Sequence, residues 1–478
     1  MQVRRRLSSL LLFGLNQHYG FLARLLIITG VVVLCFLVGY HPPFAPVYLA
    51  AGLGALLLAL LALRSMAAAL TLLIATSPLL DLSISTGTQS PLHFSLLWIG
   101  LCTVVWLVRM VVERRFRLLP SPANRPLLLF NVSALLSWLA GYAFWKPTVP
   151  RPENALTVQA GQTAIFILSA AAFFLAANHP LEEKDLRRWN GLIIVLGLGG
   201  IVLDLLPFTQ RPAGLTGGML LWPLVLLWAQ LLFNPNLSPS IRRLGWLSLP
   251  LWGLWVWQVS FAWKGGWLPA LVGLSVLLFF RSRIVFTLFL VACIVLVATN
   301  WEILAPLTYL PEEQGGSLLR PYIWYDVLRL SAYSPLLGLG PVNYMYYWHD
   351  PTFISYSLER TNWWAWYHWG YSPPSHNMFV DIFAQTGLLG LGLFLWAAIA
   401  LLGLAYRAGQ KQKPGFAQAY ARGVLAGFLA LLISSFFFAD WLIPFVYNIT
   451  IRGFQHSVYS WLLIGTLVPL LQQHGQTE

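Results

Sequence analysis

Two arginines and one histidine next to long apolar segments carry the chemistry for group transfer. His376 stands in "SPPSHNMFV", where two prolines end any preceding helix, Ser375 is expected to cap the next one, and a long apolar run follows. An imidazole has an ordinary pKa near 6.5, so it can accept a proton at physiological pH. Arg211 and Arg320 have planar guanidinium groups that suit phosphate oxygens. Taken singly, each residue is more simply explained as a polar side chain at a membrane interface.

Two further outer segments add positive charge and close backbone approach. Arg211 begins "RPAGLTGG", and glycines such as Gly214 at a helix start let a ligand approach the backbone, where free N–H groups favour an anion. Lys264 lies in the tight turn "FAWKGGW". It is therefore expected near the membrane face, either as an anchor or as a third positive charge in the same cavity.

The elements that hold these residues are membrane helices. Hydrophobic residues make up 58% of the 478 residues, charged residues only 9%, and the mean hydropathy is +0.69, whereas a soluble chain carries roughly 25% charged residues. Apolar runs close to the length that crosses a bilayer recur throughout, and backbone in lipid must be helical. The sequence predicts an all-α polytopic integral membrane protein with about 12–14 transmembrane helices. The expected spans are 22–39, 44–63, 66–80, 92–112, 125–145, 155–177, 190–207, 214–233, 244–262, 266–280, 284–300, 376–404, 418–440 and 455–472.

Basic residues gather in alternate connections, which predicts the orientation. With Arg4 to Arg6 in the cytoplasm, the clusters near residues 64, 109–117, 184–188, 242–243, 281–283 and 407–422 all fall on the same side. Both termini are then cytoplasmic, and residues 1–39 form an uncleaved first span. The net charge of +13 reflects topology, because no soluble basic module for nucleic acid is visible. The three cysteines lie in apolar runs and indicate no disulfide or metal site.

One long connection divides the chain into an N-terminal bundle (1–300), a large outer loop (301–375) and C-terminal helices (376–478). Loops of this length are commonly functional. Leu318, Ile323, Val327, Leu328 and Leu330 have amphipathic spacing, which predicts an interfacial helix that Arg320 opens. The later part of the loop is rich in aromatic residues, which are either interface anchors or platforms for sugar rings or lipid; the substrate-binding candidates are Trp364, Trp366 and Tyr367.

The order of these motifs resembles the O-antigen ligase and polymerase family of bacterial envelope glycosyltransferases. "RPYIWYDVLRL…SPLLGLGPVNY" is similar to the family's Arg-x-x-x-Trp segment followed by Pro-Leu-x-Gly-x-Gly. "SHNMFVDIFAQTGLLG" is similar to its His-Asn segment, because His376 is followed eleven positions later by Gly387, and "RPAGLTGG" resembles its earlier Arg-x-x-Gly element. The resemblance covers roughly residues 200–400. One departure is Lys264, which stands where members often have Ser-Arg-Gly and so keeps the charge without the bidentate geometry.

The resemblance implies a fold like the GT-C glycosyltransferases and a metal-independent, inverting transfer without a cofactor. The donor is an undecaprenyl-diphosphate-linked glycan, and the acceptor is a hydroxyl on lipid A–core sugar for a ligase or on growing polysaccharide for a polymerase. Arg211 and Arg320 would stabilise the diphosphate leaving group and His376 would be the general base. The implied location is the bacterial inner membrane, with the site on its periplasmic or extracellular side and membrane lipid around it.

Three alternatives remain at this point. The outer carboxylates Asp326, Asp350, Glu359 and Asp381 could supply the base, but Asp381 lies five positions after His376, which is not one helix face. A polysaccharide or lipid transporter could have as many spans. Two observations speak against it: no repeat between the halves of the sequence is detectable, and the spans contain few charged residues. A structural membrane protein would leave the arginines and the histidine without a role.

Overall fold

The computed structural model describes residues 45–84, 90–179, 181–207, 215, 217–305, 320–354, 374–437, 441–448 and 450–474. The chain forms two compact units. The first consists of Met1–Ile74 and Leu97–Leu118, and it holds α3 (Ala45–Arg64) with most of α4 (Met66–Thr76) and α5 (Phe94–Val112). The second consists of Ala75–Leu96 and Leu119–Glu478 and contains all the site residues discussed below. The predicted division at residues 300 and 375 stays a prediction.

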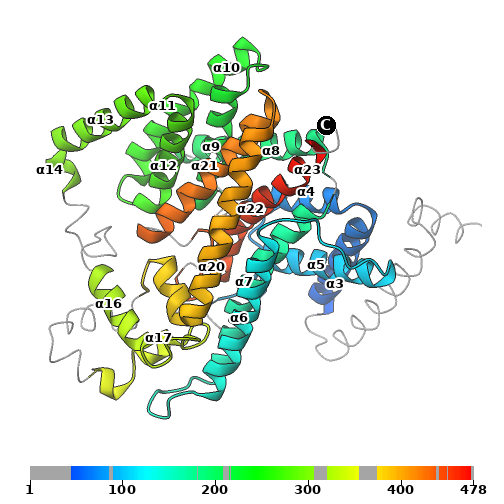
Figure 1. Cartoon of the computed structure of the whole chain (residues 1–478), viewed down its shortest axis with the longest axis vertical. Helices are drawn as coiled ribbons and strands as arrows, with labels where there is room; N and C mark the ends of the chain where they lie inside the picture. Colours follow the sequence, from blue (N-terminus) through cyan, green and yellow to red (C-terminus); the bar gives the residue numbers. More distant parts are fainter. Residues whose placement is uncertain are drawn as a thin grey trace, which may run out of the picture. The chain divides into compact units, whose positions relative to one another are not determined.

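The described part of the second unit is almost entirely helical (Figure 1). Its sheet is a two-stranded antiparallel pairing of β1 (Ser83–Ile84) with β2 (Leu92–His93). The remaining elements are α6 (Asn124–Ala143), α7 (Ala155–Ala177), α8 (Glu183–Leu205), α9 (Gly217–Phe233), α10 (Pro239–Trp246), α11 (Ser248–Trp255), the π-helix η3 (Val256–Ser260), α12 (Lys264–Arg281), α13 (Arg283–Thr299), α14 (Trp301–Leu304), α16 (Arg320–Ser331), α17 (Tyr344–Tyr347), α20 (Met378–Lys411), α21 (Phe416–Phe437), the 3₁₀-helix η5 (Ile451–Gly453), α22 (Phe454–Gly465) and α23 (Leu467–His474).

The helices confirm an all-α polytopic membrane protein. Seven helices among the described residues are long and apolar enough to cross a membrane, namely α5, α6, α7, α8, α12, α20 and α21, and four apolar helices are shorter. Each predicted span from 44–63 onward coincides with helical structure, while 22–39 lies outside the described residues.

Three predicted spans are not single continuous helices. Residues 244–262 divide between α10, α11 and η3, because a new helix begins after Leu247, where Pro250 sits in the first turn of α11 and so gives up no intrahelical hydrogen bond. The last predicted span, 455–472, is interrupted at Thr466 between α22 and α23. The predicted span 376–404 is interrupted at Gly387 inside α20. The predicted positions were therefore right, and their continuity was wrong at these three places.

Helix α9 of the second unit packs against α8, α12 and α21. Nearly all of its side chains are buried, as expected of a helix that is apolar all round. Glycines on its neighbours allow this close packing: a Cβ at Gly427 would lie 2.4 Å from Trp222, and one at Gly273 would lie 2.5 Å from Val225. Helix α13, in contrast, has no buried residue, which suits a helix that faces lipid.

Contacts between connections agree with the predicted alternation of sides. On one side, the Lys146 ammonium pairs with Asp350, and the Trp441 indole donates to the Gly265 carbonyl at 3.1 Å. On the other, the Leu119 amide donates to Asn178 at 2.6 Å. Each contact joins two connections that the charge pattern assigns to the same face of the membrane. Which face is cytoplasmic stays a prediction.

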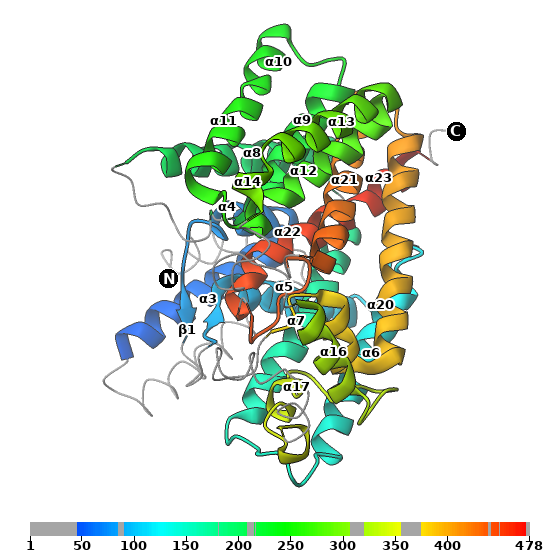
Figure 2. The same ribbon diagram turned by 90° about the vertical axis from the view of Figure 1, so that its left-hand side faces the viewer.

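The predicted amphipathic helix of the long loop exists as α16. Ile323, Val327 and Leu330 are buried in a small apolar core that α16 shares with α17 and Ala384 of α20, whereas Leu328 is exposed and does not belong to the buried face as predicted. Helices α16 and α17 lie near the same end of α20 in both views (Figures 1 and 2). The loop is thus packed onto the helix that follows His376.

Candidate active site

His376 occupies a strained position immediately before α20. Its backbone φ is +51°, a left-handed conformation that costs a non-glycine residue about 1–3 kcal/mol. The helix cap is Asn377, whose side-chain oxygen accepts from the amides of Phe379 at 3.0 Å and Val380 at 3.2 Å. The prediction that Ser375 caps the helix was wrong, because its hydroxyl instead bonds the backbone of Asn377. His376 therefore projects from a turn that both neighbours fix.

Arg320 is the charged residue that the structure brings to His376. It begins α16, is 9% exposed, and donates from Nη1 to the backbone carbonyl of Phe437. One turn later, the Trp324 indole donates to the carbonyl of Ser375 at 2.7 Å. This bond attaches α16 to the His376 turn, so the guanidinium and the imidazole share one corner of the fold.

Burial and Arg320 together keep His376 neutral. Burial is the larger cause and the nearby guanidinium charge the second, and they lower the pKa of His376 to about 3. The imidazole is therefore a proton acceptor at neutral pH. An anion bound at Arg320 would offset the repulsion that opposes imidazolium, so it would raise the basicity of His376.

The glycine motifs lock the loop after α16 onto α20. Gly387 interrupts α20 with φ +68° and ψ −170°. Around it, the amides of Leu339 and Gly340 donate to Ala384 and Gln385 at 2.8 and 3.1 Å, while those of Leu388 and Leu389 donate to Pro335 and Leu336 at 2.9 and 3.1 Å. A Cβ at Gly387 would lie 2.2 Å from the Leu336 carbonyl oxygen. The eleven positions from His376 to Gly387 therefore run from the turn before α20 to the point where the loop after α16 contacts α20.

Asp381 is fully buried one turn into α20. Its Oδ1 accepts from the Tyr344 hydroxyl at 2.7 Å, and the Tyr344 ring packs 5.1 Å from that of Tyr447. Burial first, and then the charge of Asp381, raises the pKa of Tyr344. Sequence reasoning had weighed Asp381 only as a base and missed both tyrosines, for which no motif gave a signal.

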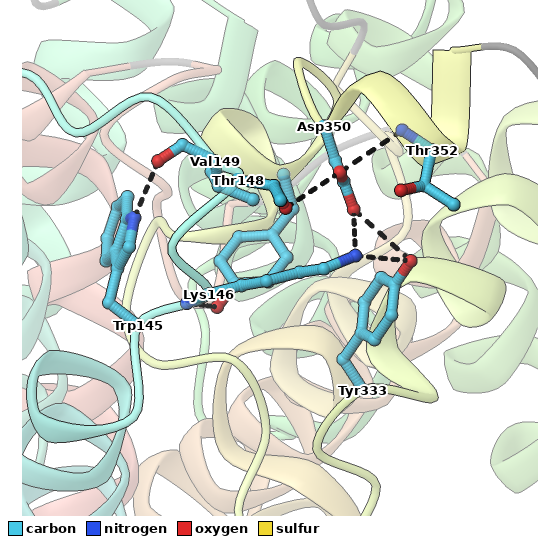
Figure 3. A network of polar contacts seen from close by, with 8 residues as sticks. Trp145, Lys146, Thr148, Val149, Tyr333, Asp350 and Thr352 are labelled. Atoms are coloured by element: carbon cyan, nitrogen blue, oxygen red, sulfur yellow. Dashed lines mark hydrogen bonds and ion pairs between the residues drawn. The ribbon is translucent and has the colours of Figure 1, made fainter.

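Lys146 and Asp350, which are 204 positions apart, form a second polar cluster (Figure 3). Asp350 is 0% exposed and accepts from Lys146, from the Tyr333 hydroxyl at 3.2 Å and from the Thr148 hydroxyl at 3.1 Å. Burial alone would raise the pKa of Asp350, but the bonds from Lys146, the Thr352 amide and Thr148 lower it overall. Asp350 is thus committed to a structural ion pair, which argues against its predicted alternative role as the base.

Several predicted site residues are not joined to this corner. Lys264 begins α12, and the carbonyl of the next residue, Gly265, accepts from the Trp441 indole. The segment that begins at Trp441 leads to Tyr447, whose ring packs against that of Tyr344. No described contact places Lys264 itself against Arg320 or His376. The remaining predicted residues lie outside the described residues, and their roles stay predictions: Arg211, Gly214, Trp364, Trp366 and Tyr367.

Residues 240–395 match the family model described as O-antigen ligase, and they contain Arg320, His376 and Gly387. This segment belongs to the O-antigen ligase family. No curated relative matches the chain. The match of this segment supports a glycosyltransferase-like enzyme of polysaccharide biosynthesis in a multi-pass membrane protein, and in general the family implies a lipid-linked glycan and a polysaccharide acceptor as partners.

Proposed function

We propose that the protein transfers a glycan from undecaprenyl diphosphate to an acceptor hydroxyl at the outer face of the bacterial inner membrane. The observation that supports this proposal most is that Arg320 and a neutral His376 lie at the same corner of the fold. The hydrogen bond from Trp324 to Ser375 holds this corner together. An arginine suits a diphosphate leaving group, and a neutral imidazole suits a hydroxyl that must lose its proton. Arg211 is proposed as the second cation on the diphosphate.

The charge changes of the two half-steps complement each other. As the acceptor oxygen attacks the anomeric carbon, its proton passes to His376, which gains a positive charge. As the glycosidic bond breaks, the bond pair leaves with the diphosphate, which gains a negative charge that Arg320 stabilises. The new charges compensate each other inside the site, so a single displacement with inversion at the anomeric carbon needs no metal in this proposal.

The test is transfer by purified enzyme given a lipid-diphosphate glycan and an acceptor. His376→Ala is expected to lower kcat by about 10²–10⁴-fold, the range for a lost general base, and Arg320→Ala by about 10²–10³-fold. His179→Ala and Arg151→Ala, remote or exposed residues of the same types, serve as matched controls. Wild-type transfer by either site variant removes that residue from the mechanism.

The acceptor decides between the two activities of this kind. A ligase consumes lipid A–core, whereas a repeat-unit polymerase extends another lipid-linked glycan and forms product without core. A transporter would change the leaflet of the lipid-linked glycan and leave the glycosidic bond intact. Analysis of the products from one reconstituted reaction separates all three.

A further inference from the structure

The side chain of Asn377 has one satisfied end and one unsatisfied end. Its oxygen caps α20 by accepting two backbone N–H groups, and the residue is 1% exposed. The reverse amide orientation would set NH₂ against those donors, so the cap fixes which way Nδ2 points. Across the residues that the structure describes, Nδ2 has no hydrogen-bond partner. The result is a buried donor with a fixed direction, directly after His376.

A matching acceptor lies in the same turn. Asp381 donates its amide to the Asn377 carbonyl at 3.0 Å, and its side chain is 0% exposed. Oδ1 is taken by Tyr344, whereas Oδ2 has no hydrogen bond of good geometry among the described residues, although the hydroxyls of Ser375 and Tyr447 also lie near this carboxyl group. Buried polar groups in native proteins are nearly always paired, so two orphans in one helical turn call for a specific explanation. A ligand that supplies one acceptor and one donor provides it.

The chemistry of the two atoms selects the ligand class. A hydroxyl both accepts and donates, so it can satisfy Nδ2 of Asn377 and Oδ2 of Asp381 together. Phosphate at neutral pH mainly accepts, so it would leave Oδ2 of Asp381 without a donor. The arginine that suits phosphate is Arg320, on another helix.

We propose that Asn377 and Asp381 form a saccharide-binding subsite at the start of α20, in which Asn377 donates to a sugar hydroxyl and Asp381 accepts that hydroxyl's proton in a hydrogen bond. The subsite rests on the proposed function, because it would hold the glycan or its acceptor beside His376. It gives Asn377 two tasks: its oxygen builds the helix start and its nitrogen binds substrate.

Substitutions at Asn377 separate these two tasks. Serine and aspartate are both good helix caps, but neither carries the Nδ2 donor. Asn377→Ser is therefore expected to unfold at the wild-type temperature and to lose kcat/KM for glycan transfer, by about tenfold or more for the lost hydrogen bond, whereas Asn377→Asp would bury a second carboxyl group close to Asp381 and is expected to unfold earlier. Asn377→Ala, which removes the cap as well, is expected to unfold earlier.

A binding arm identifies what the subsite holds. Undecaprenyl diphosphate without sugar is expected to bind wild type and Asn377→Ser equally. Weaker binding of this sugar-free carrier to Asn377→Ser would show a phosphate contact and overturn the proposal. An unchanged kcat/KM in Asn377→Ser would overturn the proposal too. So would an unfolding temperature of Asn377→Ser that is lowered enough to explain its loss of activity. Asp381→Asn, which keeps one oxygen for Tyr344 and replaces the other acceptor, is expected to show the same selective loss.

The proposed function fails separately from the subsite. If wild type transfers no lipid-linked glycan, the function is wrong, and the subsite is then tested by thermal stabilisation with an oligosaccharide of the producing cell. Stabilisation of wild type and none of Asn377→Ser supports the subsite. Equal stabilisation of both overturns it.

Discussion

Replacing Gly387 by alanine tests whether the junction between the outer loop and α20 sets the stability of this region. The added Cβ would lie 2.2 Å from the Leu336 carbonyl oxygen and 2.5 Å from the Gly338 amide nitrogen. Both neighbours are backbone atoms, so no side-chain rotation relieves the overlap. The loop and the helix must move apart.

The expected loss has two parts. Holding alanine at φ +68° and ψ −170°, a region open essentially to glycine alone, costs roughly 1–3 kcal/mol. Separating the two segments breaks at least two of the four backbone hydrogen bonds across the junction, at roughly 0.5–1.5 kcal/mol each. Gly387→Ala should therefore destabilise the protein by about 2–6 kcal/mol.

Gly392 provides the matched control in the same helix. A Cβ there meets nothing within 4 Å, so Gly392→Ala should be neutral or should stabilise the helix by up to about 1 kcal/mol. Thermal unfolding in detergent, followed by tryptophan fluorescence, compares the two variants, and glycan transfer follows the effect on the site. An unfolding temperature of Gly387→Ala equal to that of Gly392→Ala would refute this account of the junction.

Three further predictions concern the polar groups. Lys146→Ala leaves the buried carboxylate of Asp350 without its cation and should destabilise by about 3 kcal/mol, the lower end for a buried pair because Lys146 is 26% exposed; thermal unfolding equal to wild type would contradict it. The pKa of Asp350 in the folded protein lies below its ordinary value of 3.8. The stability that its ion pair contributes is therefore fully present above pH 3.8 and is lost as the pH falls through the folded pKa. Acid unfolding of wild type and Lys146→Ala measures this loss. The lowered pKa of His376 places the acidic limb of the kcat/KM profile below pH 6.5, and a limb at 6.5 would argue against His376 as the base. Tyr344→Phe keeps the ring but removes the donor to Asp381, so unfolding should show a loss of about 1–3 kcal/mol, and no loss would show that the bond is dispensable.

The membrane helices could be predicted from sequence because their signal is local. Apolar length decides a span, and the alternation of basic residues orders the connections. The helix cap was placed two residues early because serine and asparagine are both good caps. Trp324, 51 positions away, holds the Ser375 carbonyl, and the Ser375 hydroxyl bonds the backbone of Asn377. Such a choice between two suitable residues depends on tertiary contacts.

The polar partners of the site were beyond sequence reasoning for the same reason. Asp381 was ranked low by its spacing from His376, yet its partner Tyr344 lies 37 positions away in another element. Asp350 was recognised as an outer carboxylate, but nothing in its sequence neighbourhood indicates its partner Lys146. The glycine spacing was recognised as a resemblance, while its cause, contact between two backbones, is visible only in the fold.

The junction at Gly387 also defines a unit of exchange for chimeric enzymes. A loop graft that ends at residue 375 would bring a foreign Pro-Leu-x-Gly-x-Gly element against a native helix, although the four hydrogen bonds require both to fit. Residues 320–389 contain α16 with the part of the loop that follows it, the histidine, the cap and the break in α20 together. Acceptor preference should therefore pass between family members with this whole block, and loop-only grafts should yield poorly folded protein.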